Sequence, residues 1–75
     1  MNRENSPILD LNNIRRGDPE TGLYEGDVIE HDGDLWLICY ERGFYAINQA
    51  YVIKYFENID SFEYKGTRRQ TEYHT

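Results

Sequence analysis

Five consecutive apolar residues, Leu35-Trp36-Leu37-Ile38-Cys39, lie between two turn-forming pairs, Asp32-Gly33 and Arg42-Gly43. The run is too short for an ordinary helix and is bounded by glycine turns, which predicts the central strand of two successive β-hairpins. Side chains alternate between the two faces of a strand, so this strand is apolar on both faces. An antiparallel sheet with one solvated face would alternate apolar and polar residues instead. Both faces of the sheet must therefore be covered.

The same turn signals divide the surrounding chain into short strands rich in β-branched and aromatic residues. We expect strands over Asp27–His31, Asp34–Glu41, Phe44–Asn48, Tyr51–Phe56 and Ser61–Lys65. A helix across 51–59 is the alternative for the fourth strand, since its apolar residues also fit helical spacing. The predicted fold is mainly β: a small SH3-like curled antiparallel sheet or a five-stranded barrel with an irregular N-terminal segment.

Each turn-forming pair sets a register if it is a two-residue hairpin loop. The first loop would pair Val28 with Leu37, Ile29 with Trp36, Glu30 with Leu35, and His31 with Asp34. The second would pair Tyr40 with Tyr45, Cys39 with Ala46, and Ile38 with Ile47. One face would then hold Ile29, Trp36, Ile38, Tyr40, Tyr45 and Ile47, and the other Val28, Leu35, Leu37, Cys39, Phe44 and Ala46.

The cover of the second face has three candidates: the apolar residues within 8–14, the fourth and fifth strands folding over, or another chain. The domain organisation follows from composition. Residues 1–22 form an irregular segment partly packed on the sheet, residues 23–66 form the β-barrel domain, and residues 67–75 form a polar C-terminal tail. Met1–Asn5 begins no apolar run, and no window is long enough to span a membrane, so we expect a cytoplasmic protein without a signal peptide.

The charge of the chain is concentrated in its body. Residues 23–66 contain nine acidic and three basic residues, which accounts for the entire net charge of −6. Such a body repels phosphate backbones, which argues against direct binding of nucleic acid and favours a basic protein partner. An acidic excess that only keeps a small protein soluble is the alternative explanation.

Catalytic and metal-binding patterns are not recognisable in the chain. Cys39 is the only cysteine and lies in the apolar strand, where we expect it to pack as a small hydrophobe. Neither His31 nor His74 has the spacing of a zinc site, and Asp32-Gly33-Asp34 lacks the frame of a calcium-binding loop. The sequence therefore predicts no enzyme activity, no metal and no cofactor.

The segment Thr21-Gly22-Leu23-Tyr24-Glu25-Gly26-Asp27-Val28-Ile29 resembles the YopX-like proteins of bacteriophages and prophages, chiefly through Tyr24-Glu25-Gly26-Asp27. In that family a T-G-L motif and a Y-E-G-D strand open a small SH3-like β-barrel, and here the two motifs abut. The resemblance implies that fold, a phage or prophage origin, and the host-cell cytoplasm as location. It implies no mechanism.

Acidic and aromatic side chains on the hairpins are the candidate binding residues, because tyrosine and tryptophan dominate protein interfaces. The predicted partner-binding set is Asp27, Glu30, Asp32, Asp34, Trp36, Tyr40, Tyr45, Tyr51 and Tyr55. We expect a small phage-type protein-binding module that engages a host or phage protein. One form of this hypothesis is an inhibitor that imitates DNA and covers the basic channel of a nucleic-acid-binding enzyme. The alternative is a structural or assembly protein that acts as a homo-oligomer, for instance a homodimer.

Overall fold

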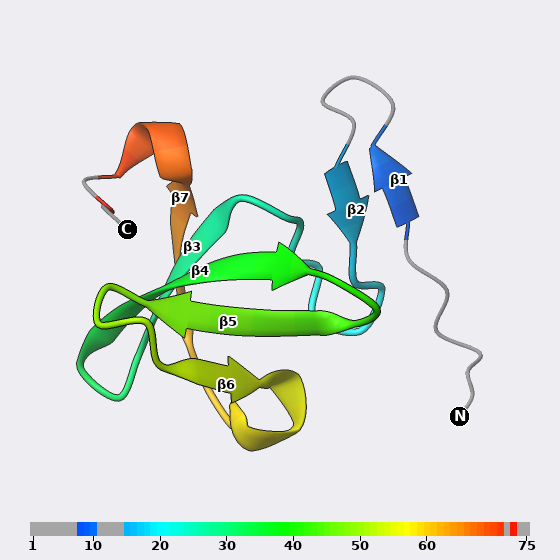
Figure 1. The fold of residues 1–75 in the computed structure, drawn as a ribbon. Helices are drawn as coiled ribbons and strands as arrows, with labels where there is room; N and C mark the ends of the chain where they lie inside the picture. The colour runs from blue at the N-terminus through cyan, green and yellow to red at the C-terminus, as the bar shows by residue number, and fades with distance from the viewer. Residues whose placement is uncertain (1–7, 11–14, 72, 74–75) are drawn as a thin grey trace.

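The structure, a computed structural model, describes residues 8–10, 15–71 and 73. Strands β1 (Ile8–Asp10) and β2 (Arg15–Gly17) form an antiparallel hairpin. The main sheet has five antiparallel strands in the order β6 (Ile53–Tyr55), β5 (Phe44–Asn48), β4 (Asp34–Tyr40), β3 (Asp27–His31) and β7 (Glu63–Thr67). Figure 1 shows the β1–β2 hairpin beside one end of this sheet.

The order of the strands confirms the predicted mainly β fold. Strands β3 to β6 form a meander, and β7 returns to pair with β3, the first strand of the meander. The single-turn 3₁₀ helix η1 (Phe56–Asn58) precedes β7, and a second one, η2 (Arg68–Gln70), follows it. This is the arrangement of a curled SH3-like sheet.

The predicted irregular N-terminal segment is wrong where the structure describes it, because residues 8–10 and 15–17 are strands. Strands of three residues are too short to give a period in the sequence. The predicted packing of the apolar side chains of 8–14 on the sheet lies outside the described residues. The hairpin meets the main domain through a bridge between Gly17 and Tyr24.

The register predicted for the first hairpin is confirmed at all four pairs, from Val28 opposite Leu37 to His31 opposite Asp34. Its two loop residues have positive φ angles, 55° at Asp32 and 75° at Gly33. This is the requirement of a type I′ turn, whose twist matches the twist of the flanking strands. Adjacent residues in the sequence thus carry enough information to set the pairing.

The register predicted for the second hairpin is wrong by one residue. Tyr40 pairs with Phe44, so the loop has three residues, 41–43. Arg42 takes a left-handed conformation with φ of 64°, as is usual for one position of a three-residue loop. A shift of one residue exchanges the faces of a strand. Phe44 and Ala46 therefore lie on the face that was predicted for Tyr45 and Ile47. Tyr45 and Ile47 lie on the face that was predicted for Phe44 and Ala46.

The fourth and fifth strands also differ from the prediction at their ends. β6 covers only 53–55 of the predicted 51–56, and the alternative helix over 51–59 is limited to the single turn η1. β7 begins at Glu63 rather than Ser61, and a bulge between Val28 and Ile29 interrupts its pairing with β3.

The inner face of the sheet forms the larger core. Its buried residues are Leu23, Ile29, Trp36, Ile38 and Ala46, with Phe44, Phe56 and Ile59 packed against them. The indole N–H of Trp36 donates to the carbonyl of His31 over 2.9 Å, so the one polar atom of this side chain is satisfied. The η1 turn and the segment after it close this face.

The outer face is covered in part by Tyr73, whose side chain is 3% exposed and packs on Val28 and Leu37. Its hydroxyl donates to the carbonyl of Ile47. Tyr73 of the predicted polar tail is therefore a structural element, and it was not among the predicted covers. A lone aromatic residue among polar neighbours has no periodic pattern by which to find it.

Burial raises the pKa of Tyr73 from 10 to about 12. Since the fold favours the neutral phenol, its contribution to stability is complete below pH 10 and is lost as the pH rises through 12. We expect Tyr73→Phe to lose less stability than the natural chain between pH 9 and pH 12, measured by urea unfolding. Parallel losses in the two proteins would contradict this assignment.

Candidate functional site

Two residues of the predicted partner-binding set, Asp27 and Trp36, are buried, with 3% and 4% exposure. Side chains this deeply buried do not present a surface to a partner, contrary to the prediction for these two residues. Trp36 belongs to the inner core. The Asp27 carboxylate accepts from Nη1 of Arg15 at 2.9 Å and from the backbone N–H of Tyr24 at 2.8 Å. Asp27 thus ties the N-terminal hairpin to the turn that opens β3.

The remaining three acids of that set have internal partners. The Asp34 carboxylate accepts from the side-chain amide of Asn48 at 2.9 Å and from the N–H of Leu35 at 3.0 Å. Glu30 forms an ion pair of 3.2 Å with Lys65. The Lys54 ammonium donates to Asp32 at 3.1 Å, which holds the pKa of that carboxyl below its ordinary value. Asp34 is thus hydrogen-bonded within the fold, whereas the carboxylates of Glu30 and Asp32 are accessible to solvent and form surface ion pairs.

His31 joins β6 to the segment before β7. Its Nδ1 lies 2.7 Å from the carbonyl of Ser61 and its Nε2 lies 3.0 Å from Nζ of Lys54. A carbonyl can only accept, so Nδ1 carries the hydrogen and Nε2 accepts from the ammonium. The His31–Asp34 pair predicted from the register is present, but Asp32, at 3.5 Å, is the carboxylate in contact with the ring. His31 therefore has a structural role, because its ring connects β3 to Lys54 of β6 and to Ser61 before β7.

Cross-strand pairing builds two rows of side chains on the outer face. One row runs from Cys39 through Tyr45 to Tyr55, and the other from Leu37 through Ile47 to Ile53. Tyr73 covers the Leu37 end, and exposure rises from 7% at Leu37 to 50% at Ile53 and 59% at Tyr55. We call these rows without Leu37 the outer-face strip, which consists of Cys39, Tyr45, Ile47, Ile53 and Tyr55; Cys39 and Ile47 adjoin the cluster around Tyr73, and Ile53 and Tyr55 are exposed.

The strip ends at β6, which is an edge strand with β5 as its neighbour in the described sheet. Directly before β6 the chain exposes Tyr51 and Val52, with exposed fractions of 67% and 52%. Asn48 shapes this turn, since its side-chain oxygen accepts from the N–H groups of Ala50 and Val52 at 2.9 Å. Ile53 and Val52 were missed as binding candidates from sequence, because the β6 run could equally have been buried.

The other predicted aromatic residues have different surroundings. Tyr40 packs edge-on against Phe44 with ring centroids 4.8 Å apart, and the Arg16 guanidinium lies 4.6 Å from its ring. Tyr40 is thus half-buried beside the N-terminal hairpin, away from β6. Tyr45 and Tyr55 pair directly, and both belong to the outer-face strip.

Cys39 is half-buried at the covered end of its row. Burial raises the pKa of its thiol, and the neighbouring Cys39 raises the pKa of Tyr45. A thiol with a raised pKa is a poor nucleophile near neutral pH. The position therefore provides apolar contact area, as the sequence predicts.

The described residues contain no cluster of three or more His, Cys, Asp or Glu side chains that could hold a metal ion. Both helices in the described ranges are single turns, and neither is long or apolar enough to cross a membrane. Comparisons with protein-family models, with curated proteins and with solved structures found no match to this chain.

Proposed function

We propose that this chain is a protein-binding module whose contact surface is the outer-face strip together with the edge of β6. The observation that carries the proposal is the exposure of Ile53 and Tyr55 at the open end of two apolar rows. Large apolar patches on a sheet edge mark interaction sites, and soluble proteins usually protect such edges with charges or bulges. The described β6 carries one charged residue, Lys54, and that side chain turns toward His31 and the ring of Trp36.

The partner that fits this surface is a protein with an extended, basic segment. An added strand would pair with β6, and its alternate side chains would rest on the two rows. The exposed acids Glu41 and Glu57 lie in the loop before β5 and in η1 after β6, and the chain carries −6 overall. Charge of this sign favours a basic partner and speeds its association.

A host or phage protein that binds nucleic acid is one such basic partner, and its inhibition by a phage protein is the finer form of the proposal. The Tyr24-Glu25-Gly26-Asp27 segment supports the resemblance to YopX-like proteins only as a fold element. In this structure its Asp27 anchors Arg15, and its Gly26 takes a φ of 90° in the turn before β3. The imitation of DNA has less support than the apolar contact, since Asp27 and Asp34 are hydrogen-bonded within the fold and the exposed Asp32 is paired with Lys54.

Replacement of Tyr55 by serine tests the proposal. We expect the natural chain to retain a protein from host lysate, and Tyr55→Ser to reduce that binding about tenfold or more, as for aromatic residues that anchor an interface. Tyr64→Ser is the matched control, because Tyr64 is a tyrosine of similar exposure, 53% against 59%, on β7 at the other end of the sheet order. Affinities of the recovered partner are compared by calorimetry. Equal losses in both variants, or none in Tyr55→Ser, would refute the strip as the contact surface.

Self-association is the second candidate, because an exposed edge strand such as β6 can pair with the same strand of another copy. Two bodies of charge −6 repel each other, so this dimer would strengthen with added salt. Sedimentation of the natural chain and of Tyr55→Ser at low and high salt distinguishes the two functions. A dimer that Tyr55→Ser dissociates would favour assembly over binding of a foreign partner.

A further inference from the structure

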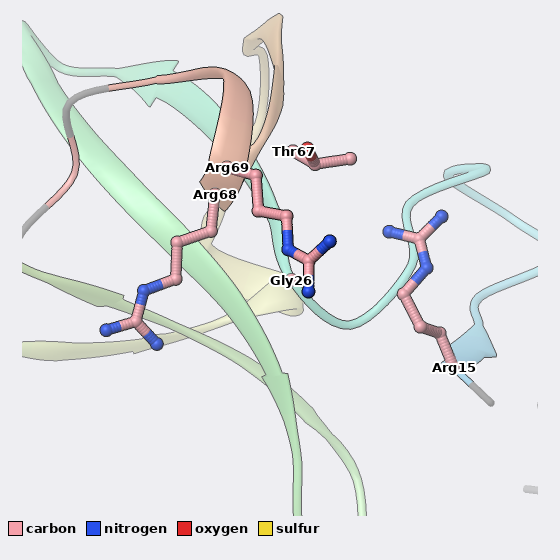
Figure 2. A pocket seen from close by; sticks show the side chains of 5 residues that line it. All are labelled: Arg15, Gly26, Thr67, Arg68 and Arg69. Carbon is pink, nitrogen blue, oxygen red and sulfur yellow. The ribbon is translucent and has the colours of Figure 1, made fainter. Parts of the chain in front are cut away.

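A pocket of about 370 Å³ lies away from β6, between the N-terminal hairpin and the end of β7. Its lining residues are Arg15, Gly26, Thr67, Arg68 and Arg69 (Figure 2). Three of the eight basic residues of the chain line this pocket, and its lining among the described residues contains no acidic side chain, although the Asp27 carboxylate pairs with Arg15 at 2.9 Å. In the sequence Arg15 is separated from Arg68 and Arg69 by more than fifty residues, which gives no sign that they line one pocket.

The walls of the pocket are held in place by contacts on both sides. Arg15 is fixed by its ion pair with the buried Asp27 and by a hydrogen bond of 3.2 Å to the carbonyl of Glu25. The η2 turn is fixed to the turn before β3, because the N–H of Arg68 donates to the carbonyl of Gly26 over 2.7 Å. Gln70 closes the turn through a bond of 2.9 Å from the N–H of Thr67. A cationic pocket is thereby built before any ligand binds, which lowers the entropic cost of binding.

The guanidinium groups reach the pocket from two different elements. Figure 2 shows the side chains of Arg15 and Arg69 extending toward the turn at Gly26, whereas Arg68 extends in another direction. Arg69 is exposed. Guanidinium groups are the preferred partners of phosphate and carboxylate groups.

We propose that this pocket binds the phosphate group of a small phosphate monoester, with Arg69 as the main contact and Arg15 supplying fixed positive charge. A phosphate monoester carries nearly two negative charges near neutral pH, which matches several arginines better than one carboxylate does. The pocket is larger than a phosphate group alone and leaves room for a small organic part. Among the residues that the structure describes, no aromatic side chain lines the pocket as a platform for a base, and the acidic body repels long polyanions.

Amide NMR of the complete chain titrated with glycerol phosphate, inorganic phosphate and acetate tests this inference. We expect saturable shifts at Gly26, Thr67 and Arg69, with the monoester bound at least as tightly as inorganic phosphate and acetate bound more weakly. Loss of one charge-assisted hydrogen bond in Arg69→Gln is expected to weaken monoester binding about tenfold. Arg42→Gln is the matched control, since Arg42 is an exposed arginine in the loop between β4 and β5.

Equal weakening in both arginine variants would mean that only the overall charge matters and would overturn the site. If acetate binds as tightly as the monoester, the proposed preference of the pocket for a phosphate group is wrong. Shifts confined to other regions would overturn the location. Dispersed amide spectra of both variants establish that they are folded. Because Tyr55 and the outer-face strip are not among the lining residues, a negative result here leaves the proposed protein contact standing, and the reverse also holds.

Discussion

Replacement of Tyr73 by alanine is expected to lower the free energy of unfolding by about 3 kcal/mol. This is the lower end of the range for truncating a buried aromatic side chain to alanine. Tyr73 covers Val28 and Leu37 on the outer face and donates its hydroxyl to Ile47. Both the apolar cover and the hydrogen bond are lost in the alanine variant. Chains of this size bury only about 60% of their unfolded surface, so such a loss removes a large part of the total stability.

The measurement is urea unfolding followed by far-ultraviolet circular dichroism and by the fluorescence of Trp36. Tyr73→Phe removes only the hydroxyl and should cost about 1 kcal/mol. Tyr64→Ala removes a side chain of the same kind that is 53% exposed, and we expect a change within about 0.5 kcal/mol. A thermal midpoint lowered by roughly 10–20 °C in Tyr73→Ala alone would agree with the structure. Equal stability of Tyr73→Ala and Tyr64→Ala would show that residue 73 does not cover the sheet.

Replacement of Asp27 by alanine is expected to destabilise the fold by about 3 kcal/mol. The variant leaves the Arg15 guanidinium without its carboxylate and the N–H of Tyr24 without its acceptor. Removal of one partner from a buried ion pair costs more than the pair contributes, because a charge stays behind in a poorly solvated place. Since Arg15 is partly exposed, the expected cost lies at the lower end of the range for buried pairs.

The control for Asp27 is Glu30→Ala, which breaks an exposed ion pair with Lys65 on the neighbouring strand. Exposed pairs contribute little, so no clear change is expected there. Asp27→Asn keeps one side-chain oxygen as an acceptor for Tyr24 and should fall between the two. Urea unfolding of the three variants gives the ranking, and a loss in Glu30→Ala as large as in Asp27→Ala would contradict it. Because Arg15 also lines the cationic pocket, Asp27→Ala is expected to disturb that pocket as well.

The candidate site was predictable only in part. Tyr45 and Tyr55 were selected as partner-binding residues, and the structure pairs them on the outer-face strip; their contact with a partner stays a prediction. Trp36 was also selected, yet it fills the inner core, because a tryptophan in an apolar strand has the same pattern whether it faces a partner or the interior. The side on which a residue of β5 lies depends on one residue in the loop at 41–43, and the sequence does not distinguish a two-residue loop there from a three-residue one.

The sequence by itself determined the strand 35–39, the first hairpin with its register, and the acidic character of the body. Each of these depends on neighbouring residues: an Asp-Gly pair that accepts positive φ angles, a run of apolar side chains, and a local count of charges. The tertiary structure alone decided which faces β5 presents, that Tyr73 covers the apolar face of the central strand, and that three arginines from two ends of the chain meet in one pocket. Contacts between distant segments are the sum of many small terms from packing, hydrogen bonds and charge, and no local pattern records that sum.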